Sequence, residues 1–197
     1  MKCGQVDLIS VMILIATVLI IGVSFTALVV FNVSDFTSRS QLSQLLSVEQ
    51  ANLAVYRELE NSTHVCIGLL RITPEYRKYA LILVSSDLRR DLLYNSVSVI
   101  SIPVSSRTLT TRLVESSRIH YFYQGNYYPL RIVSPLEGYV TVVELPDDVI
   151  ENYISQGKPA LVCINKSVVS GITSGKLMML VYVSGDLYEA GEWLVSS

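Results

Sequence analysis

The pattern of hydrophobic and polar positions opens with a long apolar run. No charged residue occurs between Leu8 and Phe31, a stretch of 24 residues. As an α-helix this stretch measures about 36 Å, enough to cross a hydrocarbon layer of about 30 Å. A secretory signal has a shorter apolar centre of about 7 to 15 residues, followed by a small-x-small cleavage site. No such site follows Phe31. The run therefore predicts a retained helix.

After this run, residues 32–60 keep a helical pattern that is apolar on one face only. Positions near helical spacing form that face: Leu42, Leu45, Leu46, Glu49, Leu53 and Tyr56. The intervening residues 32–40 are poor helix formers, so we expect the helix to loosen there. We predict a long N-terminal helix over 5–60, with an apolar part (5–31) and an amphipathic connector (32–60).

From His64 onward, the pattern changes to short segments rich in β-branched and aromatic residues. Eight segments separated by turn residues predict a sandwich or a partly closed barrel. We take residues 61–197 to be an immunoglobulin-like β-sandwich head, so the fold class is α+β. Gln124-Gly125-Asn126 reads as a hairpin turn. Pro146 opens one short helix that ends near Gly157. The predicted strands are 64–72, 78–86, 96–104, 118–124, 127–134, 139–145, 160–167 and 177–184.

Within the apolar run, Ser10, Thr17 and Ser24 recur every seven positions and form one narrow stripe on a helix. Small and hydroxylated residues, Gly22 among them, allow helices to approach closely in an apolar setting. The alternative is that these hydroxyls are merely tolerated in a lone membrane helix, since each can bond back to its own turn. The pattern does not choose between the two interpretations.

The residues before the run carry a more specific signal. Lys2, Cys3 and Gly4 form a very short basic leader, and "QVDLISVMILIATVLI" follows. This arrangement resembles the class III signal of type IV pilins, and in particular the archaeal pilin and archaellin group. The resemblance implies that residues 1–4 are a leader, which a prepilin peptidase removes between Gly4 and Gln5. It also implies that the freed Gln5 amine pairs with Asp7 of a neighbouring subunit.

Three cysteines are divided between the two parts of the chain. Cys3 precedes the apolar run, whereas Cys66 and Cys163 both fall in predicted strands of the head. A Cys66–Cys163 bond would close a loop of about 97 residues, worth about 4–5 kcal/mol, and would indicate an oxidising, extracytoplasmic setting. Two buried free thiols are the alternative. Three N-glycosylation sequons begin at Asn32, Asn61 and Asn165.

Composition and motifs argue against several other functions. The net charge of −2 and the lack of a Lys/Arg run give no support to nucleic-acid binding. The two histidines, His64 and His120, match no zinc spacing. No G-x-S-x-G elbow exists, and "GITSGK" at 171–176 has the wrong spacing for a phosphate loop. We therefore predict a protein that is not an enzyme and needs no cofactor.

The tract "HYFYQGNYY" places Tyr121 and Tyr123 on one face of its first strand and His120 and Phe122 on the other. Such a hairpin usually packs one face on the core and offers the other to a neighbouring subunit or to water. A ligand platform is the alternative.

These observations predict a structural subunit of an extracellular, pilus-like filament. Its apolar helices would sit in the membrane before an assembly platform packs them into a helical homo-oligomer, with Asp7, Ser10, Thr17, Gly22 and Ser24 at the filament-core interface. A glycosylated head would decorate the surface and serve adhesion or motility. The alternative is an uncleaved, single-pass membrane protein with an external β-domain, acting as a surface protein or assembly factor.

Overall fold

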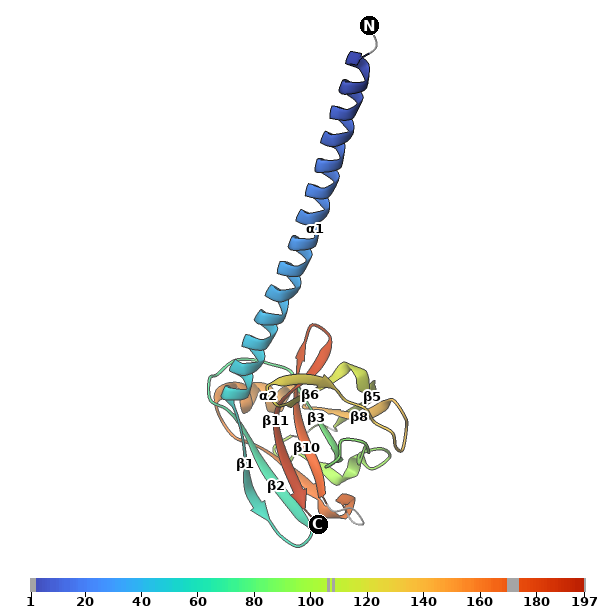
Figure 1. The fold of residues 1–197 in the computed structure, drawn as a ribbon. Helices are drawn as coiled ribbons and strands as arrows, with labels where there is room; N and C mark the ends of the chain where they lie inside the picture. Colours follow the sequence, from blue (N-terminus) through green and yellow to red (C-terminus); the bar gives the residue numbers. More distant parts are fainter. Residues whose placement is uncertain (1–2, 106, 108, 170–173, 197) are drawn as a thin grey trace. The chain divides into compact units, whose positions relative to one another are not determined.

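The computed structural model describes residues 3–105, 107, 109–169 and 174–196. The chain divides into two compact units, Met1–Leu45 and Leu46–Ser197. The first unit is helical, and the second contains the last turns of the same helix and a mostly β domain with curled sheets (Figure 1). At this level the predicted architecture, an N-terminal apolar helix followed by a β-rich domain, is confirmed.

Helix α1 spans Cys3–Asn52 and is unbroken through residues 32–40, where we expected it to loosen. The prediction that it continues to residue 60 is wrong. Asn52 ends the helix because its groups bond elsewhere: its carbonyl accepts the Ile72 N–H (2.8 Å) and its side chain accepts the Thr73 hydroxyl (2.6 Å). The two compact units divide at 45/46, within α1.

The residues that we assigned to the end of the helix form a strand instead. Strand β1 (Leu53–Glu60) pairs antiparallel with β2 (His64–Arg71), and Tyr56 lies opposite Gly68. A Cβ on Gly68 would lie 2.4 Å from the Tyr56 ring, so the ring covers this glycine directly. The near-helical spacing of Leu53 and Tyr56 therefore did not indicate a helix, because backbone pairing with β2 makes these residues a strand.

The β domain contains two sheets. One has the strand order β1-β2-β9-β4 and the other β5-β8-β3-β10-β11-β6-β7. All neighbouring strands are antiparallel except β11 and β6, which are parallel. Two strands of the larger sheet, β5 and β11, were not predicted. The remaining bounds are β3 (Tyr79–Ser85), β4 (Ile100–Ser101), β5 (Thr110–Glu115), β6 (Ile119–Tyr123), β7 (Asn126–Pro129), β8 (Tyr139–Glu144), β9 (Ala160–Asn165), β10 (Ser174–Val183) and β11 (Asp186–Ser196).

Strand β3 lies at the centre of the core and is buried along its whole length. Its residues Ala80, Ile82 and Val84 pack with side chains of β8 and β10 on one face of the larger sheet. The two sheets meet where β11 passes β1, and there a Cβ on Gly191 would lie 3.0 Å from Val55. The finer prediction, that the sandwich is of the immunoglobulin type, stays a prediction.

Two local predictions from turn residues are confirmed. The β6–β7 hairpin turns at Gln124 and Gly125, which both have positive φ (48° and 84°). The short helix α2 (Asp147–Asn152) starts after Pro146, and its following 3₁₀ turn ends at Gly157 with φ 68°. Asp147 and Asp148 lie in the first turn of α2, where carboxylates stabilise a helix N-terminus.

Candidate functional site

The most unusual surface of the first unit is its apolar helix segment. Ser10–Ser34 is long and apolar enough to cross a membrane, and none of it is buried. The large apolar side chains from Val11 to Val33 are between 40% and 76% exposed. Burying one such side chain stabilises by about 1.5–3 kcal/mol, so a continuous exposed surface of this size marks an interface with lipid or protein.

The predicted interface residues of this segment are all exposed where their side chains are described. Thr17 donates its hydroxyl to the Ile13 carbonyl (2.7 Å), which is the back-bonding of the lone-helix interpretation. Gly22 leaves open space, because a Cβ there would have nothing within 4 Å. Ser10 and Ser24 face solvent. The backbone of Gly4, Gln5 and Asp7 lies in α1, and the side chains of Gln5 and Asp7 fall outside the described part of the chain.

The last turns of α1, which belong to the second unit, carry a buried ion pair that sequence reasoning missed. Glu49 is 2% exposed and Arg71 of β2 is 1% exposed. The guanidinium meets the carboxylate at two points, Nη2 to Oε2 at 3.0 Å and Nε to Oε1 at 3.3 Å. Tyr79 of β3 donates its hydroxyl to the same carboxylate. Glu49 is therefore held by two neighbouring elements of the β domain.

The remaining donors of Arg71 are also satisfied. Nη1 reaches the carbonyls of Thr73 and Glu75 (both 3.1 Å), and Nη2 reaches the Glu75 carboxylate (2.9 Å). Burial and the bond to Glu49 raise the pKa of Tyr79, so its hydroxyl stays a donor. We call Glu49, Arg71 and Tyr79 the helix anchor, because they fix residues 46–52 to β2 and β3.

A second contact joins the end of α1 to the β6–β7 hairpin. Gln50 donates to the Tyr127 hydroxyl (2.9 Å), which donates to the Glu189 carbonyl (3.0 Å). The Glu189 side chain is 4% exposed and accepts the Phe122 N–H at 2.8 Å. Burial and a hydrogen bond to Glu192 raise the pKa of Glu189 to about 8, whereas Glu192 itself pairs with Lys176.

Because the Glu189 carboxyl is buried, we predict that the stability of the β domain depends on pH. Since the folded-state pKa of Glu189 lies above its unfolded value near 4.5, the folded state binds its proton more tightly. Stability is then fully present below about pH 4.5 and falls as the pH rises towards about 8. We expect Glu189→Gln, which mimics the protonated carboxyl, to flatten this slope in urea unfolding curves between pH 5 and 8. An unchanged slope in the variant would assign the pH dependence to other groups.

The predicted disulfide is present. Cys66 of β2 and Cys163 of β9 lie directly opposite one another in the sheet, with their Cα atoms 4.0 Å apart. The bond joins positions separated by 97 residues and fits an extracellular protein.

The three predicted glycosylation sequons lie in different surroundings. Asn32 is on α1, where its amide donates to the Leu28 carbonyl (2.9 Å). Asn61 is exposed in the β1–β2 turn, and its Oδ1 accepts the Thr63 N–H (2.9 Å) and hydroxyl (3.1 Å). Asn165 is half-buried at the end of β9, and its Oδ1 accepts the Ser167 N–H (2.9 Å). Glycosylation at these residues stays a prediction.

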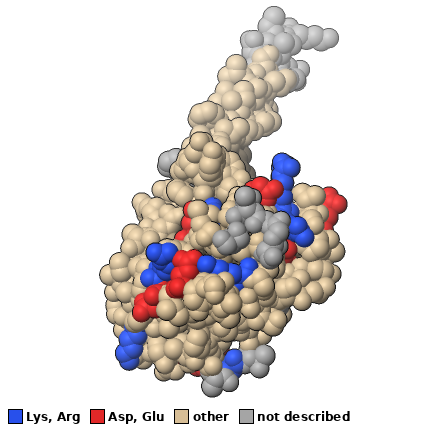
Figure 2. Space-filling view, turned by 90° about the horizontal axis from the view of Figure 1, so that it is seen from below, with Lys and Arg blue, Asp and Glu red and all other residues tan. Residues whose placement is uncertain are grey.

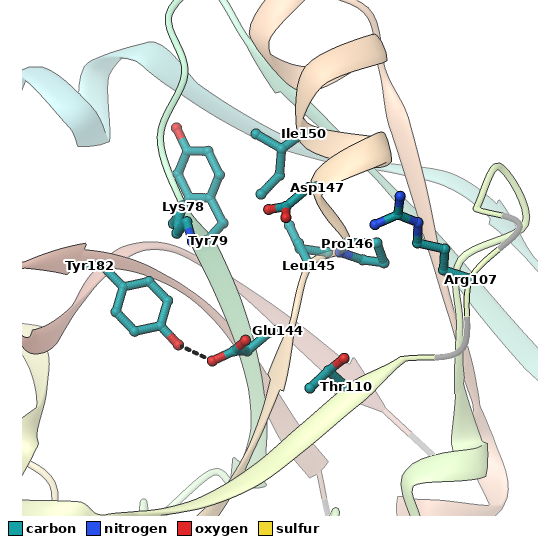
Figure 3. A pocket seen from close by; sticks show the side chains of 10 residues that line it. All are labelled: Lys78, Tyr79, Arg107, Thr110, Glu144, Leu145, Pro146, Asp147, Ile150 and Tyr182. Carbon is teal, nitrogen blue, oxygen red and sulfur yellow. Dashed lines mark hydrogen bonds between the residues drawn. The ribbon is translucent and has the colours of Figure 1, made fainter.

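A pocket of about 290 Å³ opens beside α2 (Figure 3). Its acidic groups already have partners: Glu144 accepts bonds from Tyr182 (3.0 Å) and from Arg112 outside the pocket (3.0 Å), and Asp147 accepts one from Tyr76 (3.2 Å). Burial raises the pKa of the Tyr182 hydroxyl. Both carboxylates therefore link neighbouring elements of the fold.

The charged residues of the head do not gather into a patch of one sign on the face shown in Figure 2, where acidic and basic residues lie side by side. Among the described residues, no group of three or more His, Cys, Asp or Glu side chains is placed to hold a metal ion. His64 and His120 do not come together: His64 bonds Thr63 at the β1–β2 turn, and His120 stacks on Tyr188.

Comparisons with known proteins give little further information. No family model matches the chain, and no curated protein matches it significantly. Among solved structures, the chain is similar to the human F-spondin reeler domain, at 11% sequence identity and a TM-score of 0.31. That match covers 74% of this chain and 89% of the reeler domain. The site is therefore interpreted from its own geometry.

Proposed function

We propose that this protein is the structural subunit of an extracellular filament of the archaeal type IV pilus kind, built by packing its apolar helices against one another. The observation that carries the proposal is the apolar segment Ser10–Ser34, none of which is buried by the part of the chain that the structure describes. A subunit that leaves the membrane must replace lipid contacts on this surface, and a helical array of identical helices supplies them. The immunoglobulin-like sandwich remains part of this proposal as the outward-facing head.

The helix anchor supports this function mechanically. A filament subunit needs a head that is firmly joined to the end of its own helix. The buried pair of Glu49 and Arg71 gives residues 46–52 a fixed position on the β domain. The Cys66–Cys163 bond further stabilises that domain for an extracellular setting.

The alternative is a surface protein that stays in the membrane through the same helix. The back-bonded hydroxyls of Thr17 and Thr26 favour it, because they leave no donor unsatisfied in lipid. N-terminal sequencing of the protein from its native cells distinguishes the two: a start at Gln5 supports the filament, and an intact Met1 supports the anchor. Electron microscopy of shed material for helical fibres is the direct test.

A substitution at Gly22 tests whether this surface of the helix is buried between filament subunits. Gly22→Leu adds bulk to a surface that is open in the single chain, since a Cβ at Gly22 meets nothing within 4 Å. We expect this variant to insert and to fold its β domain normally but to form no fibres. Val23→Leu, which enlarges a neighbouring side chain that is already 69% exposed, is the matched control. Fibres of Gly22→Leu at the normal yield would show that this face is not buried between subunits.

A further inference from the structure

The β domain carries a second cleft, of about 400 Å³, that takes no part in the features described above. It lies between the turn that follows β3 and the β6–β7 hairpin. Its volume falls in the range of small-ligand pockets. Its walls combine aromatic and cationic side chains with one carboxylate, and the lining residues are Asp87, Leu88, Arg89, Tyr121, Tyr128, Pro129 and Arg131.

Two tyrosine rings form the aromatic wall. Tyr121 and Tyr128 are opposite one another in the β6–β7 pair, with ring centroids 6.0 Å apart and planes tilted by 37°. The opposite face of the hairpin is packed on the domain, where His120 stacks on Tyr188 at 4.6 Å. Tyr128 is 42% exposed. Tyr121 itself packs against the core cluster, so Tyr128 is the ring that can cover the flat C–H face of a sugar.

The two arginines come from neighbouring backbone segments that are held together. The carbonyl of Arg89 accepts the Val133 N–H at 2.7 Å. Arg131 lies between the buried residues Leu130 and Ile132, so its own side chain is on the exposed side. Leu88, just before Arg89, adopts a positive φ of 60° and packs its side chain against the core. The turn is therefore fixed, and both arginines line the cleft.

The charges of the cleft favour an anionic ligand. Asp87 also lines the cleft, and its carboxylate is engaged, because it accepts the Ser85 hydroxyl and the Arg89 N–H (3.2 Å). The bond from Ser85, and to a lesser extent the charge of Arg89, lowers the pKa of Asp87, so the two arginines of the lining outnumber its one carboxylate. Among the described residues, neither Arg89 nor Arg131 forms an ion pair within 4 Å. A planar guanidinium binds a carboxylate through two parallel hydrogen bonds, which a lysine cannot reproduce.

We propose that this cleft binds an acidic saccharide, with a sugar ring against Tyr128 and its carboxylate held by Arg89 and Arg131. The proposal goes beyond the filament, since the same head would bind the same ligand in the membrane-anchored alternative. An acidic peptide would satisfy the arginines but would have no need of the exposed tyrosine ring. Dependence on both kinds of residue is thus the signature of the saccharide.

The test is calorimetric titration of the full chain, in a detergent without a sugar headgroup, with tetragalacturonate as the probe. Its methyl ester has the same rings without the charges and is the matched control ligand. We expect the ester to bind at least about 10-fold more weakly, and Arg131→Gln and Tyr128→Ala each to weaken tetragalacturonate binding by about 10-fold. Arg107→Gln and Tyr139→Ala, which remove an exposed arginine and an exposed ring elsewhere, should leave binding unchanged.

Several results would overturn the proposal. One is equal affinity for the acid and the ester, and another is the absence of any heat of binding with tetragalacturonate. If Arg131→Gln bound tetragalacturonate with wild-type affinity, the arginine would have no role in binding the ligand. Binding of a tetra-aspartate peptide that needs Arg131 but not Tyr128 would assign the cleft to acidic peptides instead. None of these results depends on whether the protein forms fibres, so they leave the filament proposal to its own tests.

Discussion

Glu49→Ala is expected to lower the free energy of unfolding of the β domain by about 3–5 kcal/mol, because it leaves a buried guanidinium without its main counter-charge. Glu49 and Arg71 are 2% and 1% exposed, so water cannot replace the lost carboxylate without opening the structure. The Glu75 carboxylate, at 2.9 Å from Arg71 but 47% exposed, compensates only in part. The measurement is urea unfolding of the full chain in detergent, followed by tryptophan fluorescence.

The matched control removes a glutamate of the same region that is solvated. Glu58→Ala on β1 changes the same charge at an exposed position, and we expect a change within about 0.5 kcal/mol. A second variant, Glu49→Gln, keeps the hydrogen-bonding shape but not the charge, and should fall between the two. Equal stability of Glu49→Ala and Glu58→Ala would show that the helix anchor contributes nothing.

The elements with strong local signals were predictable from the sequence. An uncharged run from Leu8 to Phe31 has few structures open to it other than a helix, because it must satisfy its own backbone in an apolar setting. Turns with Gly125 and Gly157 were also readable, because the backbone there requires positive φ, which glycine adopts at little cost.

The elements set by distant pairing were not predictable in the same way. Residues 53–60 carry Leu53 and Tyr56 at helical spacing, and only the partner β2 makes them a strand. Strand β11 was missed because Glu189, Gly191 and Glu192 hide its alternation, although it pairs with β10 along its length. Such pairings depend on contacts far apart in the chain, which a local pattern does not contain.

The helix anchor left a signal that we did not use. Glu49 occupies a position on the otherwise apolar face of the amphipathic helix, and Arg71 follows Val65, Ile67 and Leu69 at an inward position of its strand. A lone acid and a lone base, each at a core position, predict a buried pair, because either alone would be costly to bury. The cleft at Arg89 and Arg131 left no such signal, since exposed arginines are common on any surface.

The second large effect is expected from the disulfide. Removing the Cys66–Cys163 bond should destabilise the β domain by about 4–5 kcal/mol, because the unfolded chain regains the freedom of a loop of 97 residues. The bond also joins β2 to β9 at the centre of the four-stranded sheet, where both cysteines are buried. Its loss should therefore act on the whole domain.

The experiment needs a background in which only these two cysteines can react, so Cys3→Ala is introduced first. In this background, urea unfolding with and without dithiothreitol should give midpoints that differ by the equivalent of that free energy. The double variant Cys66→Ala/Cys163→Ala should match the reduced protein and should not respond to the reductant. A midpoint that is the same with and without dithiothreitol, in protein whose thiols titrate as free, would mean that native molecules do not form the bond. Reduction gives the unfolded chain more conformational freedom but leaves the helix anchor of the folded protein intact. Introducing Glu49→Ala into the reduced protein should therefore still lower its free energy of unfolding by several kcal/mol. This combination tests whether the two effects are independent.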